Sequence, residues 1–350
     1  MPHLLFVGSY TPNPGQPGIV VFQMDPAAGG LSPASKVDAG PNPTFLTIHP
    51  NRRFLYAVNE TGEGAVSSFA LDAEAGTLTF LNLESTLSEG PCYISIDPSG
   101  NFVLVANYSG GAVSVLPIRE DGSLGPISSI VQHSGELGPN KDRQEKAHAH
   151  CILPDPTGKF ILATDLGLDQ VLVYRLENGK LKPNDPAAAQ MNPGAGPRHL
   201  LFSGDGRFLY VANELDNTVT ACHWNAEIGQ VTPFQTVPTL PRDWKGENTV
   251  ADLHTALDGR ILYVSNRGHD SLALFRVDTD TGLLTPAGHE STGGKVPRNF
   301  AVEPGGKFLI AANQDSDSLV VFNIDPQTGT LEQIGEPVEV VKPVVIQFLA

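Results

Sequence analysis

Cysteine is scarce in this sequence. Its 350 residues include only 3 cysteines, which stand at the unpatterned positions Cys92, Cys151 and Cys222. An odd number of cysteines at irregular spacing excludes a disulfide framework, and it lacks the paired spacing of a zinc site. We therefore expect the chain to fold in a reduced, cytoplasmic setting.

Basic residues are also few. The sequence has 22 Lys and Arg against 38 Asp and Glu, which is a formal net charge of −16 at pH 7. Proteins that bind nucleic acids present basic surfaces, so this balance argues against a nucleic-acid partner. An anionic substrate would have to be attracted by local cations against the field of the whole molecule.

Long apolar runs are absent as well. No stretch approaches the roughly 18 apolar residues that a membrane-spanning helix needs. The start of the chain, MPHLLFVGSYT, has no basic region followed by a long apolar stretch, so no secretory signal is visible. We expect no membrane partner.

Glycine and proline, by contrast, are abundant, with 36 and 29 residues respectively. They mark the turns of a repeated unit that consists of a strand, a turn and a second strand. The six copies of this unit read GPNPTFLTIHPNRRFLYAVNE, GPCYISIDPSGNFVLVANY, AHCILPDPTGKFILATDL, GPRHLLFSGDGRFLYVANE, VADLHTALDGRILYVSNR and VPRNFAVEPGGKFLIAANQ. Two further strands follow each unit, the first of them reading GAVSSFAL, GAVSVLPI, DQVLVYRL, NTVTACHW, DSLALFRV or DSLVVFNI. Alternating apolar residues between turn residues are typical of antiparallel strands, so the sequence predicts six units of four strands each.

The two ends of the chain supply a seventh unit. Segment 343–349 has the pattern of a first strand, and residues 3–40 supply the other three. Closure of a ring requires such a split, and closure removes exposed sheet edges. The sequence therefore predicts an all-β fold, a seven-bladed β-propeller with four antiparallel strands per blade and a closing blade shared by the N- and C-termini. We expect residues 1–350 to form a single domain.

Two equivalent positions in the repeat converge on one mouth of the predicted ring. The first position opens each innermost strand, and its occupants are Thr44, Cys92, His150, Arg198, Ala251, Arg298 and Val344. The second position follows the end of the next strand, and its occupants are Glu60, Tyr108, Leu166, Glu214, Arg267, Gln314 and Tyr10. In an antiparallel hairpin the start of one strand and the end of the next lie at the same end, so both positions face the same mouth. Folding does not require ionisable residues there, because other blades carry Thr, Ala, Val, Leu or Gln.

Two long segments are expected on the face of the ring that carries this mouth. They are SGELGPNKDRQEKAH, before His150, and PTLPRDWKGEN, before Ala251. Long loops on one face of a repeat fold commonly wall a binding site, so we expect an anion-binding pocket at this mouth. No metal and no cofactor is expected, because the His-x-His pair of His148 and His150 lacks carboxylates or cysteines at ligand spacing. The residues expected at the site are His150, Glu214, Arg198, Arg267, Arg298, His148, His199, Glu60 and Tyr108.

Some of these residues have a competing structural explanation. Glu60 stands in ETGEG, which resembles an exposed turn, so Glu214 is the favoured carboxylate. His199 lies one residue further along its strand than Arg198, where packing between blades competes with a substrate-binding role. His148 stands in a loop, where it either supports a neighbour or faces solvent.

The repeat pattern and the segments AHAHC, GPRHLLFSGDGRFLYVANE, YVSNRG and PRNF resemble the lactonase family of seven-bladed propellers over essentially the whole chain. That family includes bacterial 6-phosphogluconolactonases of the propeller type and fungal carboxy-cis,cis-muconate cyclases. The resemblance implies hydrolysis of a small anionic sugar lactone, above all 6-phosphogluconolactone to 6-phosphogluconate in the pentose phosphate pathway. It also implies a catalytic set of His150, Arg198, Glu214 and Arg267.

The resemblance leads to a mechanistic hypothesis. Glu214 is expected to accept a proton from the attacking water while His150 protonates the leaving ring oxygen, although the reverse assignment is nearly as good. Arg198 or Arg267 would meet the developing oxyanion, and Arg298 suits a phosphate or carboxylate group. Two alternatives stay open: a lactone-forming cycloisomerase like the muconate enzymes, and a non-catalytic interaction platform, because a propeller fold by itself establishes no activity. The chain is expected to be a monomer or a weak homodimer.

Overall fold

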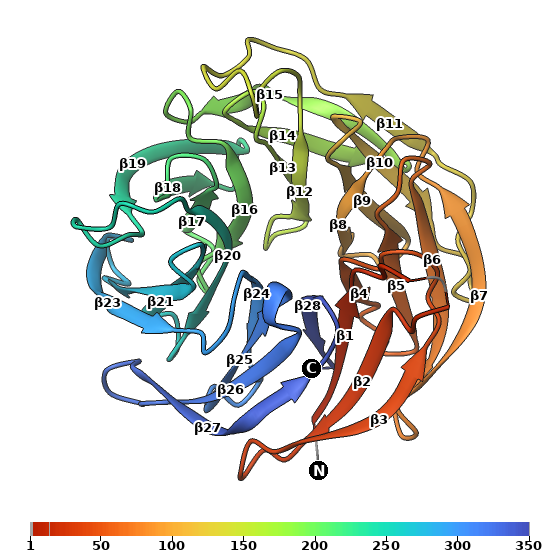
Figure 1. The fold of residues 1–350 in the computed structure, drawn as a ribbon. Coiled ribbons are helices and arrows are strands. Elements are labelled where there is room, and N and C mark those ends of the chain that lie inside the picture. The colour runs from red at the N-terminus through yellow and green to blue at the C-terminus, as the bar shows by residue number, and fades with distance from the viewer. Residues whose placement is uncertain (1–2, 14, 350) are drawn as a thin grey trace.

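The computed structural model describes residues 3–13 and 15–349. They form seven four-stranded antiparallel sheets, arranged as blades around a central axis (Figure 1). The expected all-β, seven-bladed propeller is therefore confirmed. Within the described residues the helical structure is the short 3₁₀ turn η1 (Gln314–Ser316), and no helix there has the length and apolar character needed to cross a membrane.

Six blades are continuous in sequence. Blade 1 consists of β4 (Leu46–Ile48), β5 (Phe54–Asn59), β6 (Ala65–Asp72) and β7 (Thr77–Ser85). Blade 2 consists of β8 (Pro91–Ile96), β9 (Phe102–Asn107), β10 (Ala112–Pro117) and β11 (Ser129–Gln132). Blade 3 consists of β12 (Ala149–Pro154), β13 (Ile161–Asp165), β14 (Gln170–Glu177) and β15 (Lys180–Gln190).

The second half of the ring repeats this order. Blade 4 consists of β16 (Pro197–Phe202), β17 (Phe208–Asn213), β18 (Thr218–Asn225) and β19 (Gln230–Pro238). Blade 5 consists of β20 (Thr249–Ala256), β21 (Ile261–Arg267), β22 (Ser271–Val277) and β23 (Leu284–Ser291). Blade 6 consists of β24 (Pro297–Val302), β25 (Phe308–Asn313), β26 (Ser318–Ile324) and β27 (Leu331–Glu339).

The closing blade joins the two ends of the chain. It consists, in spatial order, of β28 (Pro343–Phe348), β1 (His3–Ser9), β2 (Ile19–Met24) and β3 (Leu31–Val37). β28 pairs antiparallel with β1, with Phe348 opposite Leu5 and Val345 opposite Gly8. β1 and β28 consequently lie side by side in Figure 1, and β1 has a partner on both sides.

The hydrophobic core lies between the blades. Among the described residues, seven clusters of buried apolar side chains occupy the seven junctions between neighbouring blades. At one junction the fully buried rings of Phe6 and Phe69 belong to the same cluster. Burying a side chain of this size contributes about 1.5–3 kcal/mol. Stability is therefore spread around the ring, which leaves the axis available for polar side chains.

β-Bulges at the first ends of the innermost strands position the site. In β8, β12, β16 and β24 the pairing register shifts after the first residue, which leaves one residue unpaired: Cys92, His150, Arg198 and Arg298 respectively. In β20 the shift leaves Ala251 and Asp252 unpaired. A bulge inserts an extra residue and redirects its side chain, so the same local irregularity brings these residues to one end of the propeller in five blades.

Candidate active site

A cavity of about 390 Å³ lies where the first ends of the innermost strands meet. All seven blades, or the segments that join them, contribute to its wall, which consists of Tyr10, Glu60, Cys92, Tyr108, Arg143, His150, Glu214, Thr249, Arg267 and Arg298. Every one of these side chains carries a polar or ionisable group. The wall thus combines an imidazole, carboxylates and guanidiniums in a single cavity.

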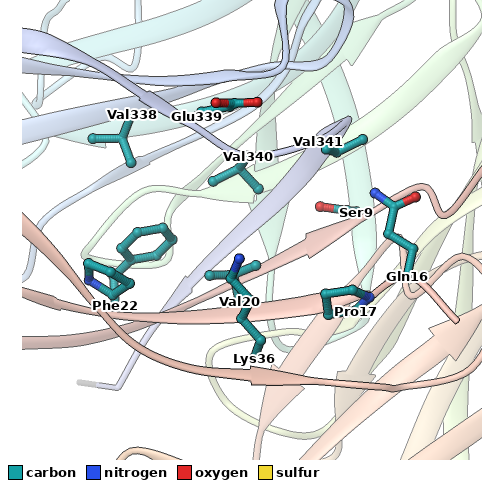
Figure 2. A pocket seen from close by; sticks show the side chains of 11 residues that line it. Ser9, Gln16, Pro17, Val20, Phe22, Lys36, Val338, Glu339, Val340 and Val341 are labelled. Carbon is teal, nitrogen blue, oxygen red and sulfur yellow. The ribbon is translucent and has the colours of Figure 1, made fainter.

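A larger cavity of about 450 Å³ lies between the closing blade and the segment after β27. Figure 2 shows that Phe22 and Val20 face Val338 and Val340 across it. The described residues of its wall include one lysine but no histidine or arginine. Since the smaller cavity on the axis gathers a histidine, three arginines and two carboxylates, it is the candidate active site.

Glu214 is the centre of the charged cluster in this cavity. Its carboxylate lies 2.7 Å from Arg143 Nη2, 3.0 Å from Arg198 Nε and 3.1 Å from Arg267 Nη2. Only 5% of its side chain is exposed. Burial opposes ionisation, but the three guanidiniums outweigh burial and lower the pKa of Glu214 to about 2. The carboxylate is therefore ionised at neutral pH and faces cations on both of its oxygens.

Arg198 lies behind the cavity wall. Its side chain is buried, and its Nη1 donates to the Ala251 carbonyl and lies 3.1 Å from His199 Nε2. Its ion pair with the cavity wall, among the described residues, is with Glu214. This arrangement departs from the expectation that Arg198 faces the substrate, because the bulge directs its side chain toward blade 5, whose own residues cover it.

Two arginines of the wall retain unused donors. Arg267 Nη2 donates to the Val250 carbonyl at 3.0 Å, whereas its buried Nε has no hydrogen-bond partner among the described residues. Burial lowers the pKa of Arg267 to about 9, which leaves the guanidinium cationic at neutral pH. The Arg298 guanidinium lies over the Tyr10 ring, 5.6 Å from its centroid. A guanidinium in the cavity wall can bind an oxyanion or an anionic group of a ligand.

Glu60 belongs to the cavity wall, which corrects its interpretation as part of an exposed turn. Its carboxylate accepts hydrogen bonds from the Tyr10 hydroxyl at 3.0 Å and from the Thr44 hydroxyl at 2.6 Å. Burial, together with the nearby Glu60 charge, raises the pKa of Tyr10 to about 12. The phenol therefore keeps its proton and holds Glu60 in place.

His150 presents an uncharged imidazole to the cavity. Its Nδ1 lies 3.8 Å from the Cys92 sulfur, and its ring packs edge-on against the rings of Tyr108 and His199, with centroids 5.5 and 5.3 Å away. Burial lowers the pKa of His150 well below its usual range, and the Arg198 charge adds to this effect. The ring is therefore unprotonated at neutral pH.

Comparison with known proteins identifies the family. The model of the family described as "Lactonase, 7-bladed beta-propeller" matches residues 4–348. The chain belongs to this lactonase family. It is 37% identical over 300 residues to a 6-phosphogluconolactonase of Bacillus subtilis, covering 85% of this chain and 84% of that protein. It is 33% identical over 311 residues to a 6-phosphogluconolactonase of Formosa agariphila, covering 86% of this chain and 87% of that protein.

A solved structure shares both the family and the fold. The periplasmic gluconolactonase of Pseudomonas aeruginosa superposes with a TM-score of 0.94 at 37% sequence identity, covering 100% of this chain and 99% of that one. The resemblance to the lactonase family, and with it the expectation of a lactonase rather than a non-catalytic propeller, is confirmed at the level of the family.

Most of the residues expected at this lactonase-family site line the cavity. They are His150, Glu214, Arg267, Arg298, Glu60 and Tyr108. Arg198, His199 and His148 are absent from the described part of the wall. Their contacts nevertheless connect each of them to a residue that does line it.

His199 and His148 support the wall from behind. His199 is buried, with Nδ1 2.7 Å from Asp252 Oδ1, because it resumes the normal strand alternation after the bulge at Arg198. His148 stacks on Tyr108, with ring centroids 4.4 Å apart, and its Nδ1 lies 3.0 Å from the Tyr108 carbonyl oxygen. The expectation that these two histidines contact the substrate is therefore not supported by their positions.

Sequence reasoning missed Arg143. It stands in the long segment before His150, where the side-chain amide of its neighbour Gln144 donates to the Leu166 carbonyl and to Asp169 Oδ1, each at 2.8 Å. The unusual length of this segment was a signal, but a loop residue has no repeat position that predicts its direction. Tyr10 occupies the second repeat position but was not among the residues expected at the site. No pattern in the sequence pointed to Thr249.

Within residues 3–13 and 15–349, no group of three or more His, Cys, Asp or Glu side chains is arranged to hold a metal ion. The side chains that gather around the cavity are instead arginines, tyrosines and one histidine, with two carboxylates already engaged by protein donors. This set can bind an anion, transfer a proton and stabilise negative charge.

Proposed function

We propose that this chain hydrolyses 6-phosphogluconolactone to 6-phosphogluconate, a step of the pentose phosphate pathway, in the cavity around His150 and Glu214. The observation that carries the proposal is that an uncharged imidazole and three arginine side chains line one cavity. The names of two relatives, a 6-phosphogluconolactonase and a gluconolactonase, support a sugar lactone as the substrate.

The charges at the cavity favour a phosphorylated lactone over a neutral one. Three arginines line the wall, a fourth lies behind it, and only two carboxylates oppose them, although the whole chain carries −16. Planar guanidiniums bind phosphate oxygens through paired hydrogen bonds. We assign the phosphate to Arg143, which is 38% exposed, and to Arg298, which forms no ion pair within the described part of the chain.

His150 is the better general base in this arrangement. Both carboxylate oxygens of Glu214 are already engaged by guanidiniums, so Glu214 is poorly placed to take a proton from water. Among the described residues, the neutral ring of His150 has the weakly polar Cys92 sulfur as the hydrogen-bond partner of Nδ1. The proposal therefore differs from the roles preferred from the sequence, in which Glu214 is the base. Here His150 accepts the proton from water, and Glu214 holds the arginines in place.

The proton transfers balance over one turnover. His150 removes a proton from water as the water oxygen bonds to the lactone carbonyl carbon. The charge that develops on the carbonyl oxygen meets the guanidinium of Arg267, which lines the cavity, a type of contact that contributes about 3–4 kcal/mol. The bond between the carbonyl carbon and the ring oxygen then breaks, and protonated His150 returns its proton to that oxygen, which leaves as a hydroxyl group.

The test is a pH-stat assay with freshly prepared 6-phosphogluconolactone and, in parallel, with unphosphorylated gluconolactone, each corrected for spontaneous hydrolysis. We expect kcat/KM to be at least about 10-fold higher for the phosphorylated lactone, and His150→Gln to lower kcat by about 10²–10⁴. His49→Gln is the matched control, because His49 lies in a turn at the opposite end of its hairpin, where its ring contacts the Gly100 carbonyl and accepts from the Asn51 amide. Equal rates on both lactones, or full activity in His150→Gln, would contradict the proposal.

Two further points belong to this proposal. A cis,cis-muconate incubated with the enzyme should keep its ultraviolet absorbance, and its loss would instead favour the cycloisomerase. We also propose a cytoplasmic location and a monomeric or weakly dimeric molecule, to be tested by cell fractionation and analytical ultracentrifugation.

A further inference from the structure

We propose that Asp252 and His199 are positioning residues of this site. Asp252 keeps the proton of His199 on Nδ1, so that Nε2 accepts a hydrogen bond from Arg198, and Arg198 then holds Glu214 in the cavity wall. The inference rests on the proposed function, because the site it concerns is the one proposed to hydrolyse the lactone. Asp252 itself lies outside the cavity wall and acts through its neighbours.

Asp252 is a buried carboxylate at which three blades meet. It lies in the bulge of β20 and is only 4% exposed. Its Oδ1 is 2.7 Å from His199 Nδ1 of blade 4, and its Oδ2 is 2.9 Å from His254 Nε2 and accepts a hydrogen bond from the Asn299 amide of blade 6. Burial opposes ionisation, but the His254 and His199 rings outweigh it and hold the pKa of Asp252 far below its usual range.

One nitrogen of the His199 ring faces a hydrogen-bond acceptor, and the other nitrogen faces a hydrogen-bond donor. A carboxylate oxygen only accepts hydrogen bonds, so the nitrogen 2.7 Å from Asp252 must carry the proton. Burial, reinforced by the Arg198 charge, lowers the pKa of His199 to about 4, so the ring is neutral at pH 7 and Nε2 is unprotonated. That Nε2 lies 3.1 Å from Nη1 of Arg198, which can only donate.

Arg198 connects the tautomer of His199 to the position of Glu214 in the cavity wall. Its Nη1 also donates to the carbonyl of Ala251 in the same β20 bulge, and its Nε lies 3.0 Å from Glu214 Oε2. A buried guanidinium is stable only where its donors meet acceptors, because its desolvation is costly. The position of one proton on His199 therefore decides whether Arg198 meets an acceptor or a second N–H group.

The substitution Asp252→Asn tests this directly. Asn299 Oδ1 accepts from the Ile346 amide at 2.8 Å, so Asn299 must direct its NH2 toward the Oδ2 side of residue 252. An asparagine at 252 therefore keeps its oxygen on that side and turns its own NH2 toward His199. Nδ1 of His199 must then accept, the proton moves to Nε2, and Nε2–H opposes the N–H of Arg198. A histidine held in the wrong tautomer by this exchange loses its function while the fold remains.

Two measurements decide the outcome. Long-range ¹H–¹⁵N correlation spectra of protein labelled at its histidine nitrogens report which nitrogen of His199 is protonated. We expect Nδ1 in the wild type and Nε2 in Asp252→Asn, with kcat lowered by about 10–100-fold and KM changed by less than about 3-fold. Protonation of Nε2 in the wild type, an unswitched tautomer in the variant, or an unchanged kcat after the switch would overturn the proposal.

Asp155→Asn is the matched control for general loss of stability. Asp155 is also buried, and it accepts from the Thr157 hydroxyl at 2.6 Å and the Phe160 amide at 2.8 Å in a turn at the far end of the β12–β13 hairpin. This variant should keep the wild-type kcat and the wild-type tautomer of His199. A comparable loss of kcat in Asp155→Asn would assign the Asp252 effect to stability and overturn the positioning role.

A second pair of variants applies if Asp252→Asn does not fold. In His199→Gln the side-chain oxygen can still accept from Arg198, whereas His199→Leu offers no acceptor. We expect kcat within about 5-fold of the wild type for glutamine and at least about 10-fold lower for leucine, and an equal loss in both would overturn the proposal. The tautomer is read without substrate, so a wild type that hydrolyses no lactone would refute the proposed function alone.

Discussion

Arg143 Nη2 lies 2.7 Å from Glu214 Oε1, and this contact joins the long segment before β12 to the end of β17 across the cavity. The Arg143 side chain is 38% exposed, whereas the Glu214 side chain is only 5% exposed. The same Nη2 donates to the Tyr108 hydroxyl at 3.1 Å. One side of this ion pair is therefore open to solvent, and an anionic ligand that enters the cavity competes with Glu214 for Arg143.

Replacing Arg143 should weaken the binding of a phosphorylated substrate more than that of a neutral one. In Arg143→Met, Glu214 keeps Arg198 and Arg267, so the wall persists while one phosphate ligand is lost. We expect KM for 6-phosphogluconolactone to rise about 10-fold, the effect of roughly 1.4 kcal/mol, with KM for gluconolactone nearly unchanged. Arg175→Met, which removes an arginine stacked on Phe160, is the control. Equal KM changes for both lactones would contradict the assignment.

Removing the charge of Glu214 should damage both stability and activity. Glu214→Gln leaves three guanidiniums around an uncharged side chain, and breaking a buried ion pair from one side costs about 3–5 kcal/mol. Urea unfolding measures the stability, and we expect kcat/KM to fall by at least about 100-fold. Glu177→Gln, at the exposed pair with Lys182, should leave both quantities unchanged. A Glu214→Gln variant as stable as the wild type would show that the cluster does not stabilise the fold.

The same carboxylate should make stability depend on pH in the acidic range. Its pKa is about 2 in the folded chain against 4.5 ordinarily, so the unfolded chain takes up the proton first as the pH falls. The stabilisation by Glu214 is therefore complete above about pH 4.5 and is lost as the pH falls toward 2. Urea unfolding between pH 7 and pH 3 should show the difference between wild type and Glu214→Gln shrinking below about pH 4.5. A difference independent of pH would contradict the low pKa.

The thiols should be unreactive in the folded protein. Burial raises the pKa values of Cys151 and Cys222 to about 12 and that of Cys92 further, and the thiolate is the reactive form. A disulfide reagent at about pH 8 should modify no thiol in the native chain, but all 3 cysteines in concentrated guanidinium. Rapid modification of Cys92 in the native protein would instead place a nucleophile in the cavity wall.

Closure by β28 should be essential for folding. A chain that ends at Lys342 lacks the buried residues Val345 and Phe348 and exposes the edge of β1. We expect it to aggregate or to melt far below the full chain in a thermal scan. A circular permutant that begins at Pro343 and joins the original ends through a short glycine linker should fold normally. A soluble truncated chain with an unchanged melting temperature would contradict the role of closure.

Much of the site follows from the repeat alone. Side chains in a strand alternate with a period of two, and the same register recurs in each blade, so equivalent positions reach equivalent places. This is why His150, Arg298 and Cys92, which follow one pattern, line the same cavity as Glu60 and Glu214, which follow the other. Sequence could not separate cavity residues from their supports, because Arg198 occupies the same bulge position as His150 yet is covered by blade 5.

The ring, its closing blade and the mouth at which the ionisable residues gather can be read from the sequence, because local periodicity and turn residues set these features. The folded structure is needed to show that Arg143 enters the cavity, that His199 contacts Asp252, and that Glu214 is surrounded by three guanidiniums. These contacts join residues of different blades and of an irregular loop. Their geometry depends on how blades pack against each other, and no local pattern in the chain encodes it.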